Sequence, residues 1–487
     1  MFIQNREELT SHGDREGRAM ALDILEAGLV AADPYTNICN LFRIEDDKLF
    51  IGGYPEKDIS GYGDEMIDLS EIENIYVIGA GKAVQRQAQA LEDMLGDRLT
   101  AGAICVKHGE GSHLRRIEVN EAAHPIPDEN SISGARKIVA LAERAGEKDL
   151  VFTLFSDGAS SLFVLPAPGL ELVDVQQVFA LGIKYGSQMV IVEAMRYLSA
   201  VKAGRILMKC HPAHTVNTIM QVGLAPRWHG HMPEEGNYAP TWPPIPPRLA
   251  EGVALLKSRP WWNEFTPRVR HALESLDPNC ELPNLEEWTK IRHCFWQPID
   301  LYQMLEGARA KAKELGLHGV VLSSRLVAYS DAAANVLAHI AHECESLDRP
   351  FSPPVALITG GHLDVPIGDA TGIGGRNQEF ALLWARALGS GLLASKRVVV
   401  AAMDSDGTDG PGTQRRAASG EGVGEPFCMA GGVTDGYFME EAAAASVDVD
   451  AELRNHNSSI ALMKLKSAIY TSNTGMALGD LRVAVVR

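Results

Sequence analysis

Residues 75–82 read Ile75-Tyr76-Val77-Ile78-Gly79-Ala80-Gly81-Lys82, an apolar run that ends in two glycines and a lysine. A polar-faced helical pattern follows over residues 85–95. A buried strand, a glycine turn and a helix make up the first part of a βαβ unit, and successive units of this kind build a largely parallel sheet. Because the same alternation recurs along the chain, we predict an α/β fold with a doubly wound sheet.

A second junction of this type lies at residues 151–161, where the run Val151-Phe152-Thr153-Leu154-Phe155 ends in Ser156-Asp157-Gly158-Ala159-Ser160-Ser161. Ligands of open parallel sheets bind beyond the carboxyl ends of the strands, so both turns are candidate sites. Their amides and hydroxyls can hold a phosphate, and Lys82 would add a positive charge. Two structural alternatives stay open, a tight strand-to-helix turn at 79–82 and a helix-capping turn at 156–161. A hydrolase elbow around Ser160 is disfavoured because Leu162 stands where the pattern needs glycine.

The composition changes between about residues 225 and 298, where Pro, Trp and His concentrate. Such a stretch is typical of a long connection with two short helices rather than of a repeat or a low-complexity linker. We therefore predict an N-terminal lobe over residues 1–300, with this connection near 225–298, and a C-terminal α/β lobe over residues 301–487.

The chain of 487 residues carries 45 Lys and Arg against 63 Asp and Glu, a formal charge of −18. This charge disfavours nucleic acid and anionic membranes as partners. No run of 18 apolar residues and no leader-like start occur, so we expect a cytoplasmic protein. The seven cysteines are scattered and never stand in a C-x-x-C spacing, which argues against a disulfide framework and against a zinc site. The pair His229 and His231 has no third ligand nearby, so a metal is disfavoured there as well.

Three further groups of residues suit anionic ligands or a metal. Lys202 and Arg205 stand at i and i+3, which predicts one face of a helix or its end and suits an anion clamp, although an exposed basic face has the same spacing. A glycine loop at 372–375 leads into a helix that begins near Arg376, a position suited to binding a carboxylate or phosphate. The stretch Asp404-Ser405-Asp406-Gly407-Thr408-Asp409-Gly410-Pro411 crowds three carboxylates, which suits Mg²⁺ binding or general-base work, with a cluster of Asx turns as the alternative.

Six motifs in order carry a resemblance: Gly79-Ala80-Gly81-Lys82, His124-Pro125-Ile126-Pro127-Asp128-Glu129, Leu198-Ser199-Ala200 with Lys202 and Arg205, Gly374-Gly375-Arg376-Asn377-Gln378-Glu379, Asp406-Gly407-Thr408-Asp409-Gly410-Pro411, and Thr474-Gly475 with Asp480-Leu481-Arg482-Val483. Together they resemble the glycerate 2-kinase family, which has a Rossmann-like N-terminal lobe and a C-terminal MOFRL lobe. The resemblance extends from about residue 17 to the end.

The resemblance implies transfer of phosphate from ATP, with Mg²⁺, to the 2-hydroxyl of D-glycerate or a related small hydroxy acid. Phosphoryl transfer needs mainly positioning and charge neutralisation, which fits these residue types. The implied catalytic residues are Lys82, Arg376 and Asp406; the implied metal ligands are Asp406 and Asp409; the implied substrate or phosphate ligands are Gly79, Gly81, Ser156, Ser160, Lys202, Arg205, Asn377 and Thr474.

Several positions depart from the family pattern. Asp157 puts a carboxylate where the family has glycine in the phosphate-binding turn, His362 replaces an expected glutamate, and residues 221–228 replace another motif. These changes predict an altered substrate, altered nucleotide handling or lost activity. Two other functions therefore stay open, an NAD(P)H-dependent hydroxypyruvate reductase, which the absent third glycine after Gly81 disfavours, and a non-catalytic small-molecule-binding relative. The exact acid, the hydroxyl that accepts phosphate and a homodimeric state are left open.

Overall fold

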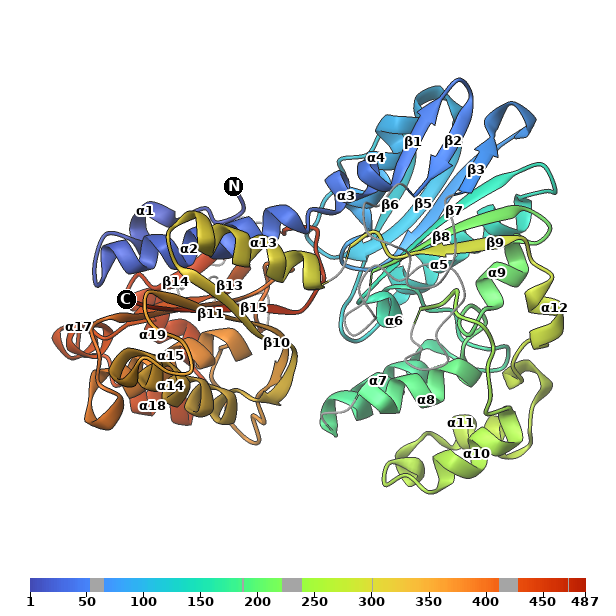
Figure 1. Ribbon diagram of the computed structural model, residues 1–487. Coiled ribbons are helices and arrows are strands. Elements are labelled where there is room, and N and C mark those ends of the chain that lie inside the picture. The colour runs from blue at the N-terminus through green and yellow to red at the C-terminus, as the bar shows by residue number, and fades with distance from the viewer. Residues whose placement is uncertain (53–64, 186–187, 221–238, 300, 411–427, 472) are drawn as a thin grey trace. The chain divides into compact units, whose positions relative to one another are not determined.

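The structure is a computed structural model that describes residues 1–52, 65–185, 188–220, 239–299, 301–410, 428–471 and 473–487. The chain divides into two compact units (Figure 1). Unit 1 combines Met1–Asp33 with Asp300–Arg487, and unit 2 consists of Pro34–Ile299.

Unit 2 is built on a six-stranded sheet with the order β6-β5-β4-β7-β8-β9, in which every pairing is parallel. In chain order the strands are β4 (Ile75–Ala80), β5 (Leu99–Lys107), β6 (Ile117–Ala122), β7 (Leu150–Ser156), β8 (His214–Met220) and β9 (His293–Trp296). The strand order reverses between β4 and β7, as in the doubly wound Rossmann arrangement. The predicted fold of the N-terminal lobe is confirmed.

Helices cover both faces of this sheet. Helix α4 (Val84–Leu95) packs with α3 (Pro34–Leu41) over one face, and α5 (Glu129–Arg144) covers the other. A three-stranded antiparallel sheet adds to the first face, with β1 (Phe42–Glu45), β2 (Lys48–Ile51) and β3 (Glu65–Asp68). Its Ile51 and Ile67 share a hydrophobic core with Val216, Cys294 and Trp296 of β8 and β9.

The stretch expected to be a connection is more ordered than predicted. It contains α10 (Leu249–Lys257), α11 (Pro267–Glu274), α12 (Leu285–Thr289) and the edge strand β9. Helices α10 and α11 pack with α7 (Leu172–Lys184) and α8 (Gln188–Leu198) around a core of their own, which includes Trp261 and Trp262. The tryptophans of this stretch that the structure describes are therefore core residues. Residues 221–231, with the altered motif and the histidine pair, lie outside the described residues.

Unit 1 has a second six-stranded sheet with the order β10-β11-β15-β12-β13-β14. Its strands are β10 (His318–Tyr329), β11 (Val355–Asp364), β12 (Val398–Asp404), β13 (Cys428–Asp435), β14 (Ala468–Thr471) and β15 (Asp480–Val486). The pairing of β10 with β11 is parallel, whereas the other four pairings are antiparallel. The largely parallel arrangement is thus found in unit 2 and does not extend to this sheet.

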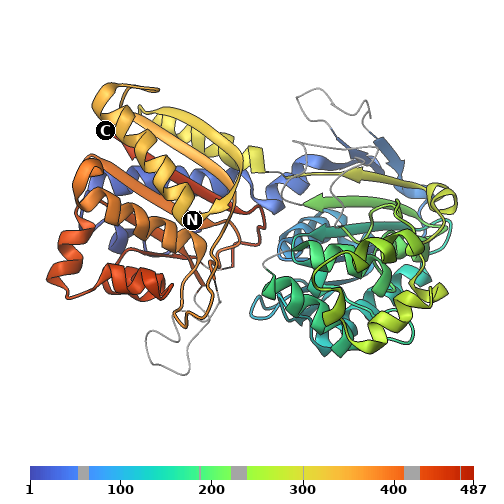
Figure 2. The same cartoon turned by 90° about the horizontal axis from the view of Figure 1, so that it is seen from below.

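The first 33 residues group with the C-terminal lobe rather than with the N-terminal lobe in which the sequence placed them. Helix α2 (Arg15–Ala31) packs against α13 (Leu301–Glu314), β12 and β15, so blue and yellow-to-red segments lie together in this unit (Figure 2). Gly28 allows the close crossing, because a Cβ there would lie 2.9 Å from the carbonyl oxygen of Met304. Buried Arg18 also pairs with buried Asp435 of β13. The opposite face of the sheet is covered by α14 (Ser330–Leu347) and α15 (Arg376–Gly389).

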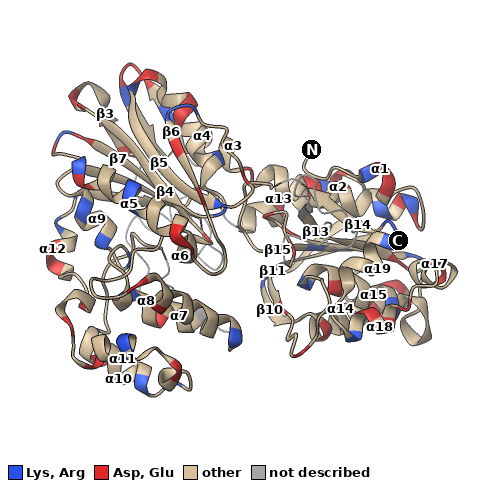
Figure 3. Cartoon of the chain, turned by 180° about the vertical axis from the view of Figure 1, so that it is seen from behind, with Lys and Arg blue, Asp and Glu red and all other residues tan. Residues whose placement is uncertain are grey.

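Residues of both charges are scattered along the chain in both units (Figure 3). Among the described residues, no helix combines the length and the apolar character needed to cross a membrane.

Candidate active site

The two predicted loops of unit 2 meet at the point where the strand order reverses. Strands β4 and β7 are parallel neighbours, so their carboxyl ends lie side by side. The amide of Lys82 donates to the carbonyl of Asp157 at 2.9 Å, and the amide of Ala83 donates to Ser156 Oγ at 3.0 Å. The hydroxyl of Ser156 therefore caps the start of α4, and the glycine turn and the loop 156–161 form one unit.

Close packing of β4 on β7 explains the glycines of the turn. A Cβ at Gly79 would lie 2.2 Å from the carbonyl oxygen of Leu154, and a Cβ at Gly81, where φ is +142°, would lie 2.1 Å from Ser156 Oγ. Both positions require glycine whether or not a ligand binds. Gly158 brings the loop against Lys82, since a Cβ there would lie 2.9 Å from Lys82 Cγ. The lysine side chain thus lies along the loop.

Lys202 contacts the same loop. Its side chain is buried, and Nζ donates to the carbonyl of Ala159 at 3.0 Å. Burial lowers the pKa of Lys202 to about 7. Ser160 is half-buried in the short helix α6 (Ala159–Leu162) of this loop. Four predicted residues, Lys82, Ser156, Ser160 and Lys202, therefore gather around one loop at the carboxyl end of β7.

Arg205 does not join this group, and the predicted clamp with Lys202 is not formed. Its guanidinium donates to four backbone carbonyls, those of Arg196, Lys202, Cys280 and Glu281, at 2.7–3.5 Å. Helix α9 (Arg205–Cys210) begins only at this residue, after Gly204 in the left-handed conformation. The two cations are not on one helix, so the argument from their spacing was wrong. Arg205 ties α9 to the segment before α12.

A groove of about 580 Å³ lies elsewhere in unit 2, at the starts of α5 and α7. Arg136, Glu129 and Glu171 are among its lining residues. None of the predicted site residues lines it.

In unit 1, Arg376 is the centre of a buried network of charges. It is the first residue of α15, and its Nε donates to both carboxylate oxygens of Asp480, at 2.9 and 3.0 Å. Its Nη2 donates to Asp404 and also lies 2.7 Å from Asp480. Its Nη1 lies 4.0 Å from Asp409 and makes no hydrogen bond among the described residues. These carboxylates raise the pKa of Arg376 further, against the effect of burial.

Asp480 and Arg482, on the central strand β15, were not predicted as site residues. Asp480 binds Arg376, Arg482 and the amide of Asn377. Burial would raise the pKa of Asp480, but the two guanidinium groups outweigh it and lower the pKa to about 2. The sequence did contain a sign of this pair. Asp480 and Arg482 are charged residues in the otherwise apolar run that ends the chain, and charged residues are buried in such a strand only when they are paired.

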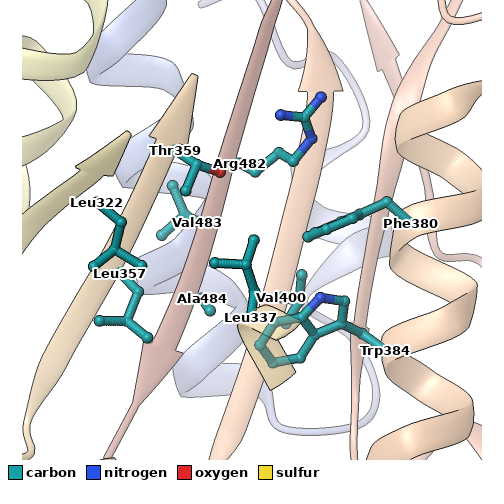
Figure 4. A pocket seen from close by; sticks show the side chains of 10 residues that line it. All are labelled: Leu322, Leu337, Leu357, Thr359, Phe380, Trp384, Val400, Arg482, Val483 and Ala484. Carbon is teal, nitrogen blue, oxygen red and sulfur yellow. The ribbon is translucent and has the colours of Figure 1, made fainter. Parts of the chain in front are cut away.

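Arg482 also lines a small apolar cavity, beside the ring of Phe380 (Figure 4). The cavity has a volume of about 10 Å³, close to what one water molecule needs. Nε and Nη1 of Arg482 have no hydrogen-bond partner within the described part of the chain.

Asp409 caps α15 rather than facing a metal. Its carboxylate accepts the backbone amides of Asn377 and Gln378 at 2.9–3.2 Å, and it is fully buried. A carboxylate at a helix N-terminus is stabilised by these amides and by the helix dipole. Burial nevertheless raises the pKa of Asp409 to about 6. The geometry therefore assigns Asp409 a structural role in place of the predicted metal-binding role, and Asn377 joins it to Asp480 through its side-chain amide.

Asp404 and Asp406 form consecutive Asx turns, the alternative that the sequence left open. Asp404 Oδ1 accepts the amide of Asp406 at 3.0 Å, and Asp406 Oδ1 accepts the amide of Thr408 at 2.7 Å. Thr474 is buried, and its hydroxyl donates to the carbonyl of Ser405 and so closes the loop. Pro411, the last residue of the predicted motif, lies outside the described residues.

The carboxylates of this loop are hard oxygen ligands, the type that Mg²⁺ prefers. In the regions that the structure describes, no three metal-ligating side chains converge here. Magnesium in kinases is usually held by one or two carboxylates together with the phosphates of the nucleotide. The donor set at Asp404 and Asp406 fits that arrangement.

Comparisons with known proteins agree with the order of these motifs. A domain of unknown function, DUF4147, matches residues 20–221, and the MOFRL family matches residues 355–480. The chain is 31% identical to a glycerate 2-kinase of Pyrococcus horikoshii, over 96% of this chain and 98% of the relative. It is 30% identical to a D-glycerate 2-kinase of Thermotoga maritima, over 87% and 93%. A putative hydroxypyruvate reductase of Agrobacterium vitis is 28% identical, over 84% and 98%.

Solved structures show the same fold. A glycerate kinase from Thermotoga maritima matches with a TM-score of 0.72 and 26% identity, over 96% of this chain and 99% of the other. A protein from Pyrococcus horikoshii matches with a TM-score of 0.68 and 28% identity, over 98% and 99%. The chain therefore belongs to the glycerate 2-kinase family of enzymes.

Proposed function

We propose that this protein transfers a phosphoryl group from ATP to the 2-hydroxyl of D-glycerate or of a closely related small hydroxy acid. One observation carries the proposal. Lys82, Ser156 and Lys202 share one loop at the switch point of a doubly wound sheet, where such folds bind their ligands. The activity of the related glycerate 2-kinases supports this class of reaction.

In unit 2, Lys82 supplies positive charge to the transferring phosphate. Its backbone amide is held by the carbonyl of Asp157, and the stem of its side chain lies against Gly158 of the loop. The start of α4 directly after Lys82 adds the positive end of a helix dipole. Lys202 has no acidic partner in the described part of the chain and supports the loop from the buried side through Ala159.

In unit 1, we assign Nη1 of Arg376 to the carboxylate or phosphate of the substrate. Nε and Nη2 are held by Asp480 and Asp404, which fixes the plane of the guanidinium. Asp406, with Asp404, would hold Mg²⁺ together with the nucleotide phosphates, where the ion would supply positive charge. Asp409, Asn377 and Thr474 hold this loop and the start of α15 in place.

Phosphorus NMR tests the reaction directly. The protein is incubated with ATP, Mg²⁺ and, separately, D-glycerate and other three- and four-carbon hydroxy acids. We expect ADP and a phosphomonoester coupled to the proton on C2 of the acid. A monoester on C3 would contradict the regiochemistry, and no monoester with any acid would contradict the kinase assignment.

A reductase is the second candidate, because some relatives carry the name putative hydroxypyruvate reductase. Absorbance at 340 nm with NADH or NADPH and hydroxypyruvate distinguishes it, since a kinase leaves the cofactor unchanged. We further propose that the protein acts in the cytoplasm on small molecules, which its charge of −18 supports.

A further inference from the structure

Three side chains with metal-binding atoms converge in unit 2, away from the candidate active site. They are Glu65 of β3, His214 of β8 and Cys294 of β9. One ligand atom from each lies within 4.8 Å of the other two. Among the described residues, this is the one group of three such side chains.

The topology explains why these residues meet. His214 and Val216 are on one face of β8, and Cys294 is the register partner of Val216 on β9, so the imidazole and the thiol are diagonal neighbours on that face. The three-stranded sheet covers the same face through Ile67. Glu65 stands two residues before Ile67 on β3 and so shares its inward-facing side.

The group is buried and one of its atoms is unpaired. His214 is 6% exposed and Cys294 is 2% exposed. Nδ1 of His214 has no hydrogen-bond partner in the described part of the chain. A buried polar atom without a partner is costly, so it points to a ligand that completes it.

We propose that Glu65, His214 and Cys294 bind a divalent metal ion of the kind that prefers nitrogen and sulfur ligands, such as Zn²⁺. The ion would link the three-stranded sheet to the main sheet of unit 2. Imidazole, thiolate and carboxylate are the donors that zinc accepts, and three protein ligands leave one position for water. Neighbouring ligand atoms of a tetrahedral zinc site lie about 3.5 Å apart, so atoms that now lie within 4.8 Å of one another need to approach by at most about 1.3 Å. The thiolate and the carboxylate together neutralise the charge of the ion.

The surroundings of the three residues support this assignment. Nε1 of Trp296 donates to Cys294 Sγ at 3.4 Å, a contact that also stabilises a metal-bound thiolate. The exposed guanidinium of Arg292 opposes the cation and limits its affinity.

The site is structural rather than catalytic. His214 is paired with Leu150 at the start of β7, whereas Ser156 is at the end of the same strand. Six residues of strand separate the two positions, about 20 Å. Metal binding replaces the thiol proton of Cys294 by a sulfur–metal bond and releases that proton to solvent, one per ion. The odd number and scattered positions of the cysteines predicted no zinc site, because the ligands come from three strands far apart in the sequence.

Titration of the chelator-treated, full-length protein with Co²⁺ tests the proposal. We expect one equivalent to bind, with a thiolate-to-cobalt charge-transfer band, release of one proton, displacement by Zn²⁺ and a higher melting temperature. Cys294→Ser is expected to lose the charge-transfer band and at least ~100-fold in affinity. Cys210→Ser is the matched control, because Cys210 is also fully buried in unit 2 and its thiol is not part of the group.

Glu65→Gln is the second variant, because it is nearly isosteric at a half-buried position and preserves folding. It is expected to keep the charge-transfer band and bind at least ~10-fold more weakly. Binding without the band, an unchanged affinity in Cys294→Ser, or no stoichiometric binding by the wild-type protein would each overturn the proposal.

Discussion

Asp480 holds Arg376 through both of its carboxylate oxygens, which accept from Nε at 2.9 and 3.0 Å. The same carboxylate accepts from Arg482, so one buried acid serves two guanidinium groups, that of buried Arg482 and that of Arg376, whose side chain is 16% exposed. The first residue of α15 and the first residue of β15 are thereby fixed to each other.

Asp480→Asn is expected to lower the free energy of unfolding by about 3–5 kcal/mol, because it removes the carboxylate that pairs with buried Arg482 and leaves Arg376 with the hydrogen bond to Asp404. Urea unfolding at neutral pH measures the change. The matched control is Asp450→Asn, which removes an exposed pair with Arg386 and should leave the transition unchanged. The pKa of Asp480 is lowered to about 2, so its contribution is present above pH ~4 and is lost as the pH falls toward 2. An equal effect of the two substitutions would contradict the network.

Buried Lys202 should make the free energy of unfolding depend on pH between about 7 and 10.5. Its pKa is about 7 in the folded protein against 10.5 ordinarily, so between these values the unfolded chain binds more protons. The free energy of unfolding should therefore rise with pH over this window, by up to ~1.4 kcal/mol per pH unit. Unfolding curves at pH 7, 8 and 9 measure the slope. It should be smaller by that amount in Lys202→Met and unchanged in Lys209→Met, a lysine paired with Glu143 at the surface.

Lys82→Ala tests the proposed charge on the transferring phosphate. Removal of one such charge should lower kcat by ~10²–10³-fold, measured as ADP release coupled to NADH oxidation. The melting temperature should hardly change, because the lysine is only half-buried. Lys137→Ala, which removes a surface pair with Glu118, is the control and should keep full turnover. Wild-type turnover in Lys82→Ala would refute the role.

Arg205→Ala tests whether Arg205 has a structural role or binds an anionic substrate. The side chain holds four carbonyls, so its loss should cost about 2–4 kcal/mol of unfolding free energy. Well below the melting temperature, KM for both substrates should stay at the wild-type value. A raised KM with unchanged stability would restore the predicted clamp with Lys202.

Asp157→Asn removes a negative charge from the loop that meets Lys82. Its two backbone hydrogen bonds, to Lys82 and Met220, do not depend on the side chain. We expect KM for ATP to fall by about 3–10-fold, the effect of one unit charge at the edge of a solvated site. A higher KM instead would show that the carboxylate helps to hold the nucleotide, through its metal.

Much of unit 2 could be predicted from local pattern, because a buried strand followed by glycine identifies each strand end. The adjacency of β4 and β7 could not be read from those patterns, since strand order depends on long-range pairing. Lys82 and Ser156 were therefore both expected at strand ends, and the sheet order explains why they meet.

The errors have local physical causes. Gly204 adopts a left-handed conformation and interrupts the helical spacing on which the Lys202–Arg205 clamp depended. Asp409 was expected to face a metal, but the free amides at the start of α15 compete for the same oxygens. The grouping of α2 with unit 1 depends on contacts with residues hundreds of positions later, such as Asp435, which no local pattern contains.

The place of β15 in the sheet sets an order for folding during synthesis. This strand lies between β11 and β12 in the sheet of unit 1. The pair β10–β11 and the group β12–β13–β14 therefore cannot join into one sheet until residues 480–486 have left the ribosome. Helix α2 packs on β12 and β15, so it too can pack fully only after β15 has been synthesised. Unit 2 is continuous from Pro34 to Ile299 and has all its strands long before then. The nascent chain therefore completes the parallel sheet of unit 2 first, while α2 lacks its partner strands until β15 has been synthesised.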